Sequence, residues 1–267
     1  MNIKIVLIAG LLLFGLIGCG WSELMVSKIP GSKIVVDGNH EDWTGKLKYF
    51  ENERVAVGFQ NDEDYLYFCL VTADKANARK IMALGLTIWF QPSGDEETIG
   101  LLYPLRMDNV SPKNLLGMNR NKNVNSDFEL TVNRMMQNQG EFELVNDDDE
   151  ILYSAALGSN DGFKIKVGVV NQQFIYEAKV PIGNNELAQI PINVFPNEKI
   201  SIQFETGEID MEEMKQNGNM RSPGMGQGGG GMQGGGGRGA MQSGSHSGKS
   251  RMGLERFKLD VDVKLAK

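Results

Sequence analysis

The sequence predicts an all-β fold, an antiparallel β-sandwich of the immunoglobulin-like or jelly-roll type with one or two short helices. From residue 33 to residue 206, short segments rich in β-branched and aromatic residues are separated by turn residues. The final segment, 254–265, alternates apolar and polar side chains almost without interruption, which is typical of a strand with one buried face. Short strands at regular intervals favour a sandwich or barrel over alternating strand and helix units.

The N-terminal segment predicts export. Lys4 precedes an apolar run over residues 5–17, and this run ends at Gly18 and Cys19. The run is too short to span roughly 30 Å of hydrocarbon, which argues against a transmembrane helix. A small residue followed directly by cysteine resembles the bacterial lipobox, whose cysteine thiol receives a diacylglycerol and becomes the first residue of the mature protein.

This resemblance implies a signal peptide over residues 1–18, acylation of Cys19, and a lipid-anchored linker over residues 19–32. The expected partner of Cys19 is then the lipid bilayer, and the expected location is the cell envelope, outside the cytoplasm. Because Gly20 rather than aspartate follows the cysteine, the outer membrane is favoured where the organism has one.

Two hairpins are expected in the first half of the domain that spans residues 33–267. Residues 34–36 suggest an opening strand before the turn pair Asp37-Gly38. The hairpin segments are 54–60 with 65–71, around the loop 61–64, and 86–91 with 98–103.

Helices are expected at two places. Residues 74–84 carry apolar side chains at helical spacing, Asp74 can cap the first turn, and Gly85 can end the last one. Residues 126–136 suggest a second, shorter helix.

The second half continues with further predicted strands, at residues 151–157, 163–170, 174–180 and 199–205. Residues 215–250 then change character, with two runs of four glycines among Met, Gln, Ser and Arg. Such a composition cannot bury enough apolar area to offset the entropy of ordering it. Because a strand-like segment follows, we interpret residues 215–250 as a flexible Gly/Met-rich insertion before the last strand.

Charge and cysteine content limit the classes of function. The chain has 267 residues and a formal net charge of −7, which argues against nucleic acid as a partner. If Cys19 is acylated, Cys69 is the only free cysteine, and its strand-like surroundings predict a small buried side chain rather than a nucleophile. No catalytic motif is recognisable, so the sequence predicts a protein that is not an enzyme.

The body of the chain has a family resemblance that rests on several short motifs. They are residues 35–38 followed by Asp42-Trp43, the hairpin 56–68, and the segments 85–90, 100–104 and 174–181. Together they resemble family 9 carbohydrate-binding modules and the related DOMON-like sandwiches. The resemblance implies a β-sandwich and, as the most natural ligand, a poly- or oligosaccharide.

Sugar recognition generally uses aromatic faces with polar groups around them. Trp43 and Trp89 are the tryptophans within the predicted domain and are therefore the candidate ligand-binding residues. Each is also a candidate for the core, because large aromatic side chains are mostly buried.

We expect no cofactor and no obligatory metal. The acidic segments 61–64 and 147–150 offer oxygen ligands for calcium, although a hairpin turn and a solvated loop explain them more simply. The leading hypothesis is a membrane-anchored, extracytoplasmic, non-catalytic binding module for a carbohydrate. The alternative is an interaction or assembly protein of the envelope, in which the sandwich and the Gly-rich arm contact a protein or polymer partner.

Overall fold

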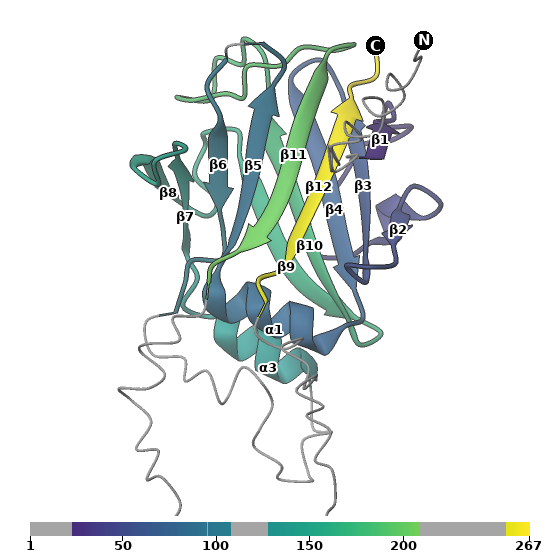
Figure 1. Cartoon of the computed structure of the whole chain (residues 1–267), viewed down its shortest axis with the longest axis vertical. Coiled ribbons are helices and arrows are strands. Elements are labelled where there is room, and N and C mark those ends of the chain that lie inside the picture. The colour runs from purple at the N-terminus through teal and green to yellow at the C-terminus, as the bar shows by residue number, and fades with distance from the viewer. Residues whose placement is uncertain (1–22, 95, 108–127, 209–254) are drawn as a thin grey trace, which may run out of the picture.

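The computed structural model describes residues 23–94, 96–107, 128–208 and 255–267, which form two β-sheets packed face to face (Figure 1). The seven-stranded sheet has the order β1 (Glu23–Val26), β12 (Lys258–Lys264), β11 (Lys199–Thr206), β5 (Leu86–Pro92), β6 (Ile99–Leu102), β7 (Glu141–Val145) and β8 (Ile151–Ala156). The five-stranded sheet has the order β2 (Lys48–Phe50), β3 (Val55–Asn61), β4 (Tyr65–Thr72), β10 (Gln173–Pro181) and β9 (Lys164–Val170). The predicted all-β sandwich is therefore confirmed.

The two predicted helices are also present, as α1 (Lys75–Leu84) and α3 (Phe128–Met136), and both lie at one end of the sandwich (Figure 1). The Asp74 carboxylate accepts hydrogen bonds from the N–H groups of Ala76 and Asn77 and so caps α1. Gly85 ends α1 with φ of +81°, a conformation that side-chain-bearing residues rarely adopt. Neither helix has the length and apolar character needed to cross a bilayer, within the described ranges.

Alternation along the strands places one face of each sheet in a shared core. Val55, Val57 and Phe59 of β3 are buried there, as the sequence pattern predicts. Phe68 on β4 reaches across to Phe204 on β11, with ring centroids 5.7 Å apart. Such tilted and edge-on aromatic contacts join the two sheets through their centre.

The structure differs from the sequence-based expectation at the N-terminal side. Residues 23–26, placed in a linker by the prediction, form β1 and pair with β12, so the sandwich begins ahead of residue 33. This pairing is parallel, whereas an all-antiparallel sandwich was expected. Residues 34–36 are not a strand, because this segment crosses the outer face of the five-stranded sheet instead of joining an edge.

Strands β2 and β7 were not predicted. Cys69 is buried on β4, and burial raises the pKa of its thiol well above the ordinary range, as expected of an inert buried side chain. Cys19, the signal peptide over 1–18 and the insertion 215–250 lie outside the described residues.

Tyr176 gives a test of the core. Its side chain is fully buried against Phe68, and its hydroxyl has no hydrogen-bond partner among the described residues. A buried hydroxyl without a partner loses its hydration without compensation. Tyr176→Phe is therefore expected to raise the free energy of unfolding by about 1 kcal/mol, measured as a higher urea midpoint at constant m-value.

The matched control is Tyr103→Phe. The Tyr103 ring lies 6.3 Å from that of Tyr176, and its hydroxyl donates to the Gln139 carbonyl at 3.5 Å. Removing a hydroxyl that has a partner is expected to leave the midpoint unchanged or lower it. A lower midpoint for Tyr176→Phe than for the wild type would contradict the prediction.

Candidate functional site

Trp43 is not available to a ligand. Only 1% of its surface is exposed, and it lies in a second apolar cluster on the outer face of the five-stranded sheet, with Cys69 and Ile175. The candidate ligand-binding role of Trp43 is thereby corrected, because neither face of its indole reaches solvent. The alternative that the sequence left open, core packing, is the one that the structure adopts.

A buried carboxylate holds Trp43 in place. Glu177 of β10 is fully buried and accepts the indole N–H of Trp43 through Oε1 at 2.7 Å. Its Oε2 accepts the backbone N–H groups of Gly38 at 2.8 Å and Asp37 at 3.1 Å. Burial raises the pKa of this carboxyl above its ordinary value, although the three hydrogen bonds act in the opposite direction.

Two glycines allow the chain to lie close to the sheet at this point. Gly38 has φ of +83°, and a Cβ added at Gly168 of β9 would lie 2.1 Å from the Gly38 carbonyl oxygen. Glu177 and this close contact fasten residues 37–43 onto the five-stranded sheet. The residues around Trp43 therefore have a structural role. Glu177 is one of them, and the sequence alone did not identify it.

Trp89 lies on the opposite side of the molecule. It stands between Ile88 and Phe90 on β5, both of which are buried in the main core, so its side chain points outward from the seven-stranded sheet. Its side chain is only partly buried. Because the two tryptophans lie on the outer faces of different sheets, they cannot clamp one ligand between them.

Strand register builds a polar surface around Trp89. Trp89 is paired with Gln203 on β11, and Gln203 is paired with Asp260 on β12. The two flanking rows, read from β5 to β12, are Gln91, Ser201 and Asp262, and Thr87, Glu205 and Lys258. Paired residues of a sheet project to the same face, so these three rows form one continuous outer surface.

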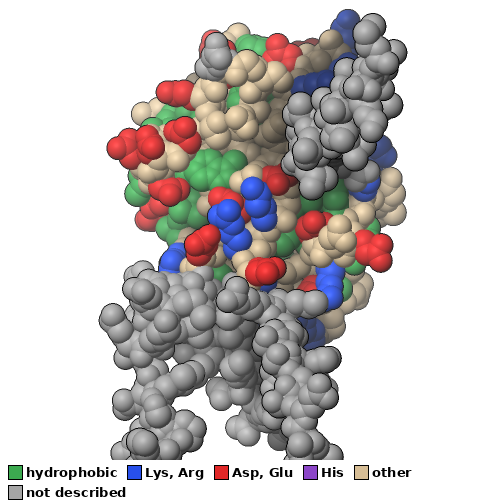
Figure 2. Space-filling model, viewed as in Figure 1, with side chains coloured by type: hydrophobic (Ala, Val, Ile, Leu, Met, Phe, Trp, Pro, Cys, Tyr) green, Lys and Arg blue, Asp and Glu red, His purple; other side chains and the backbone are tan. Residues whose placement is uncertain are grey.

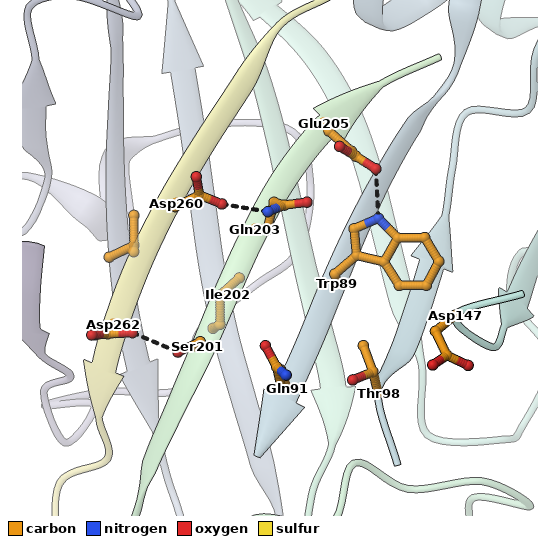
Figure 3. A pocket seen from close by; sticks show the side chains of 11 residues that line it. Trp89, Gln91, Thr98, Asp147, Ser201, Ile202, Gln203, Glu205, Asp260 and Asp262 are labelled. Carbon is orange, nitrogen blue, oxygen red and sulfur yellow. Dashed lines mark hydrogen bonds between the residues drawn. The ribbon is translucent and has the colours of Figure 1, made fainter. Parts of the chain in front are cut away.

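A glycine lets the indole lie against the sheet. Gly100 of β6 is the neighbour of Trp89 on the other side of β5, and a Cβ added there would lie 2.7 Å from Cζ3 of the ring. With no side chain at Gly100, one face of the indole rests on the sheet and the other faces outward, as Figure 3 shows. The indole N–H donates to Oε1 of Glu205 at 2.9 Å, which fixes the orientation of the ring.

The surface around Trp89 is hollowed, with a volume of about 540 Å³ that falls within the range of small-molecule sites. Its polar lining comes from β5, β11 and β12, from the residue before β6 and from the turn after β7: Gln91, Thr98, Asp147, Ser201, Gln203, Glu205, Asp260 and Asp262. Hydrogen bonds from Gln203 to Asp260 and from Ser201 to Asp262 order part of this lining. We call this feature the Trp89 hollow.

Carboxylates dominate the charge of the Trp89 hollow. Among the residues that the structure describes, four acidic side chains line it and no lysine or arginine does. The nearest described ion pairs lie at its border, where Arg256 approaches Glu205 at 3.4 Å and Lys258 approaches Asp260 at 3.7 Å. Figure 2 shows this face, with apolar atoms over β5 and acidic and basic side chains around them.

The two acidic segments considered as calcium ligands are held by hydrogen bonds within their own turns. In the loop 61–64, Asp62 accepts the N–H groups of Asp64 and Tyr65 and the hydroxyl of Tyr67. At residues 147–150, the backbone of the turn is held by the side chain of Asn146. Within the described ranges, no group of three or more His, Cys, Asp and Glu side chains is arranged to hold a metal ion.

No protein-family model matches the chain, and no curated protein matches it in sequence. Among solved structures, it is similar to a family 9 carbohydrate-binding module from Caldicellulosiruptor kristjanssonii, in complex with glucose (11% identity, TM-score 0.35, 71% of this chain and 81% of that chain). A family 9 module from the same organism, in complex with cellotriose, gives 10% identity and a TM-score of 0.36 over 91% of this chain and 94% of that chain.

A protein from Bacteroides uniformis whose carbohydrate binding is proposed gives 8% identity and a TM-score of 0.36, over 70% of this chain and 84% of that chain. The structural neighbours thus include the family that the sequence resembles. At these identities and TM-scores, the case for a ligand rests on this chain's own side chains.

Proposed function

We propose that the protein is a non-catalytic carbohydrate-binding module and that the Trp89 hollow is its binding site. The observation that carries the proposal is the outward face of Trp89, supported from beneath by Gly100 and held by Glu205. The apolar face of a pyranose ring packs on an aromatic ring of this kind, and its hydroxyl groups need donors and acceptors around the edge. Gln91, Gln203 and the neighbouring carboxylates supply those groups.

The charge of the hollow selects among glycans. A uronate or sulfated sugar would bring a negative charge among four carboxylates, and desolvating like charges together is unfavourable. A neutral glycan can instead donate its hydroxyl protons to those carboxylates in charge-assisted hydrogen bonds. We therefore propose a neutral poly- or oligosaccharide as the ligand.

The proposal includes the membrane anchor that the lipobox resemblance implies. With Cys19 acylated, the module is held at the cell envelope by its lipid and recognises glycan outside the cytoplasm. An open sheet face with one aromatic platform offers few contacts, so micromolar to millimolar dissociation constants are expected.

Two tryptophan variants are expected to distinguish an effect on glycan binding from an effect on folding. Trp89→Ala is expected to weaken binding at least about tenfold with little loss of stability, because the side chain is partly exposed and lies outside the main core. The measurement is a glycan array of neutral and uronate-containing oligosaccharides, followed by calorimetry with the best ligand. Trp43→Ala is the contrast, and it is expected to cost about 3–5 kcal/mol of stability because the ring is buried.

A second variant tests the geometry without removing the ring. Gly100→Val places atoms where the indole now rests, so it is expected to displace Trp89 and to weaken binding while the aromatic residue remains. The proposal would be overturned if folded wild-type protein bound no glycan on the array. It would also be overturned if Trp89→Ala and Gly100→Val both bound with wild-type affinity. The envelope interaction hypothesis would then be preferred.

A further inference from the structure

An apolar strip follows the first strand of the sandwich. Leu24, Val26 and Ile29 have 52%, 62% and 53% of their surfaces exposed, which is unusual for three large aliphatic residues within six positions. Leu24 and Val26 project outward from β1, and Met25 between them packs against the core. Ile29 lines a separate hollow of about 570 Å³ with Pro196, Ala266 and Lys267. We call these three aliphatic residues the β1 strip.

Basic residues accompany the β1 strip. Val26 is paired with Lys264 of β12, Lys28 lies between Val26 and Ile29, and Lys267 lines the same hollow as Ile29. Acidic residues are also present, since Asp62 and Glu63 line that hollow and Leu24 is paired with Asp262. Asp62 is engaged by the backbone of its own turn and by Tyr67.

The position of the strip along the chain identifies its partner. Three residues separate Cys19 from Glu23, where β1 begins, so the four steps from Cys19 to Glu23 can span at most about 14 Å when fully extended. A lipid on Cys19 would thus hold β1 within this distance of the headgroups. Exposed aliphatic side chains with lysines beside them are the combination that interfacial anchors use.

We infer that the β1 strip is a bilayer-contacting surface, by which the β1 edge of the sandwich rests against anionic headgroups beside its anchor, tilted so that Trp89, three strands away on the same outer face, remains open to a glycan. The choice of a lipid surface rests on the proposed acylation of Cys19, whereas the binding itself does not need the acyl chain. Leu24, Val26 and Ile29 enter the interface, and Lys28, Lys264 and Lys267 face the lipid phosphates.

The experiment uses the mature chain with Cys19→Ser, which cannot be acylated, in sedimentation with phosphatidylcholine vesicles with and without phosphatidylglycerol. We expect weak, salt-sensitive binding that increases with phosphatidylglycerol. Val26→Glu and Ile29→Glu together are expected to reduce the bound fraction at least about tenfold. The control is Ile151→Glu, at an equally exposed aliphatic residue on β8, the other edge of the same sheet.

Binding that is absent for Cys19→Ser, or that is equal in the double variant and the control, overturns the inference. The unacylated chain could instead form a dimer that dissociates in the double variant, without any vesicle binding. That result would assign the β1 strip to contact with a second copy of the chain and would also overturn the inference. Mass spectrometry of the membrane-extracted native protein reports separately on the acyl group. An unmodified N-terminus would refute the proposed anchor, whatever the vesicles show.

Discussion

Truncation of the chain after Gly218, which removes β12, is expected to abolish folding. Four apolar side chains of this segment, Leu259, Val261, Val263 and Leu265, are each at most 4% exposed. At about 1.5–3 kcal/mol for each buried aliphatic side chain, their loss is comparable to the whole stability of a domain. β12 also lies between β1 and β11, so its removal leaves β1 without a partner and opens a new sheet edge.

The matched variant is deletion of residues 220–247, which keeps β12. Loop closure changes by only about 0.6 kcal/mol for each doubling of length, so this deletion is expected to shift the melting temperature by no more than a few degrees. Thermal unfolding followed by circular dichroism compares the two. A truncated chain that melts cooperatively at the wild-type temperature would show that β12 is not needed for the fold.

Glu177→Ala is expected to lower the free energy of unfolding by about 3 kcal/mol or more. The substitution leaves three donors without their acceptor, the indole of Trp43 and the N–H groups of Asp37 and Gly38, and each buried unpaired donor costs about 1–3 kcal/mol. Residues 37–43 then lose their main polar attachment to the five-stranded sheet. Urea unfolding measures the loss, and Glu186→Ala, at an exposed glutamate, is the control.

The effect of Glu177→Ala depends on pH in a defined direction. Burial raises the pKa of Glu177 from its ordinary value of 4.5, so the folded protein takes up this proton at a higher pH than the unfolded chain does. As the pH falls through the folded pKa towards 4.5, this residue contributes increasing stability to the wild type. The difference between wild type and Glu177→Ala should therefore widen in that interval, and a difference that narrows would contradict the assigned pKa direction.

Local patterns predicted much of the fold. β3 and β4 are runs rich in apolar and aromatic residues on either side of a short acidic loop, and α1 carries its own cap and stop residues, so both could be predicted from neighbouring residues. β1 and β2 have only four and three residues, too few for a periodic pattern, and their pairing partners are distant in the sequence. Residues 34–36 have strand-like composition, but the apolar cluster around Trp43 determines their position.

Of the residues that line the Trp89 hollow, only Trp89 was predicted from the sequence to bind a ligand. Trp89 could be singled out as an aromatic residue of a half-buried strand, but its environment depends on register between β5, β11 and β12. The segment that became β12 was predicted to have a polar face, which includes Asp260 and Asp262. That this face lies beside Gln203 and Trp89 depends on pairings across 57 and more residues, to which no local pattern is sensitive.

The parallel pairing of β1 with β12 also determines how the molecule transmits mechanical tension. The anchor that we propose at Cys19 would pull on β1, whose four residues are paired in register with Val261–Lys264. When the pull follows the strand axis, the β1–β12 hydrogen bonds are sheared together instead of being opened one at a time. β12 carries Asp260 and Asp262, so under the proposed function the force on a bound glycan would reach the anchor through two adjacent strands of the seven-stranded sheet.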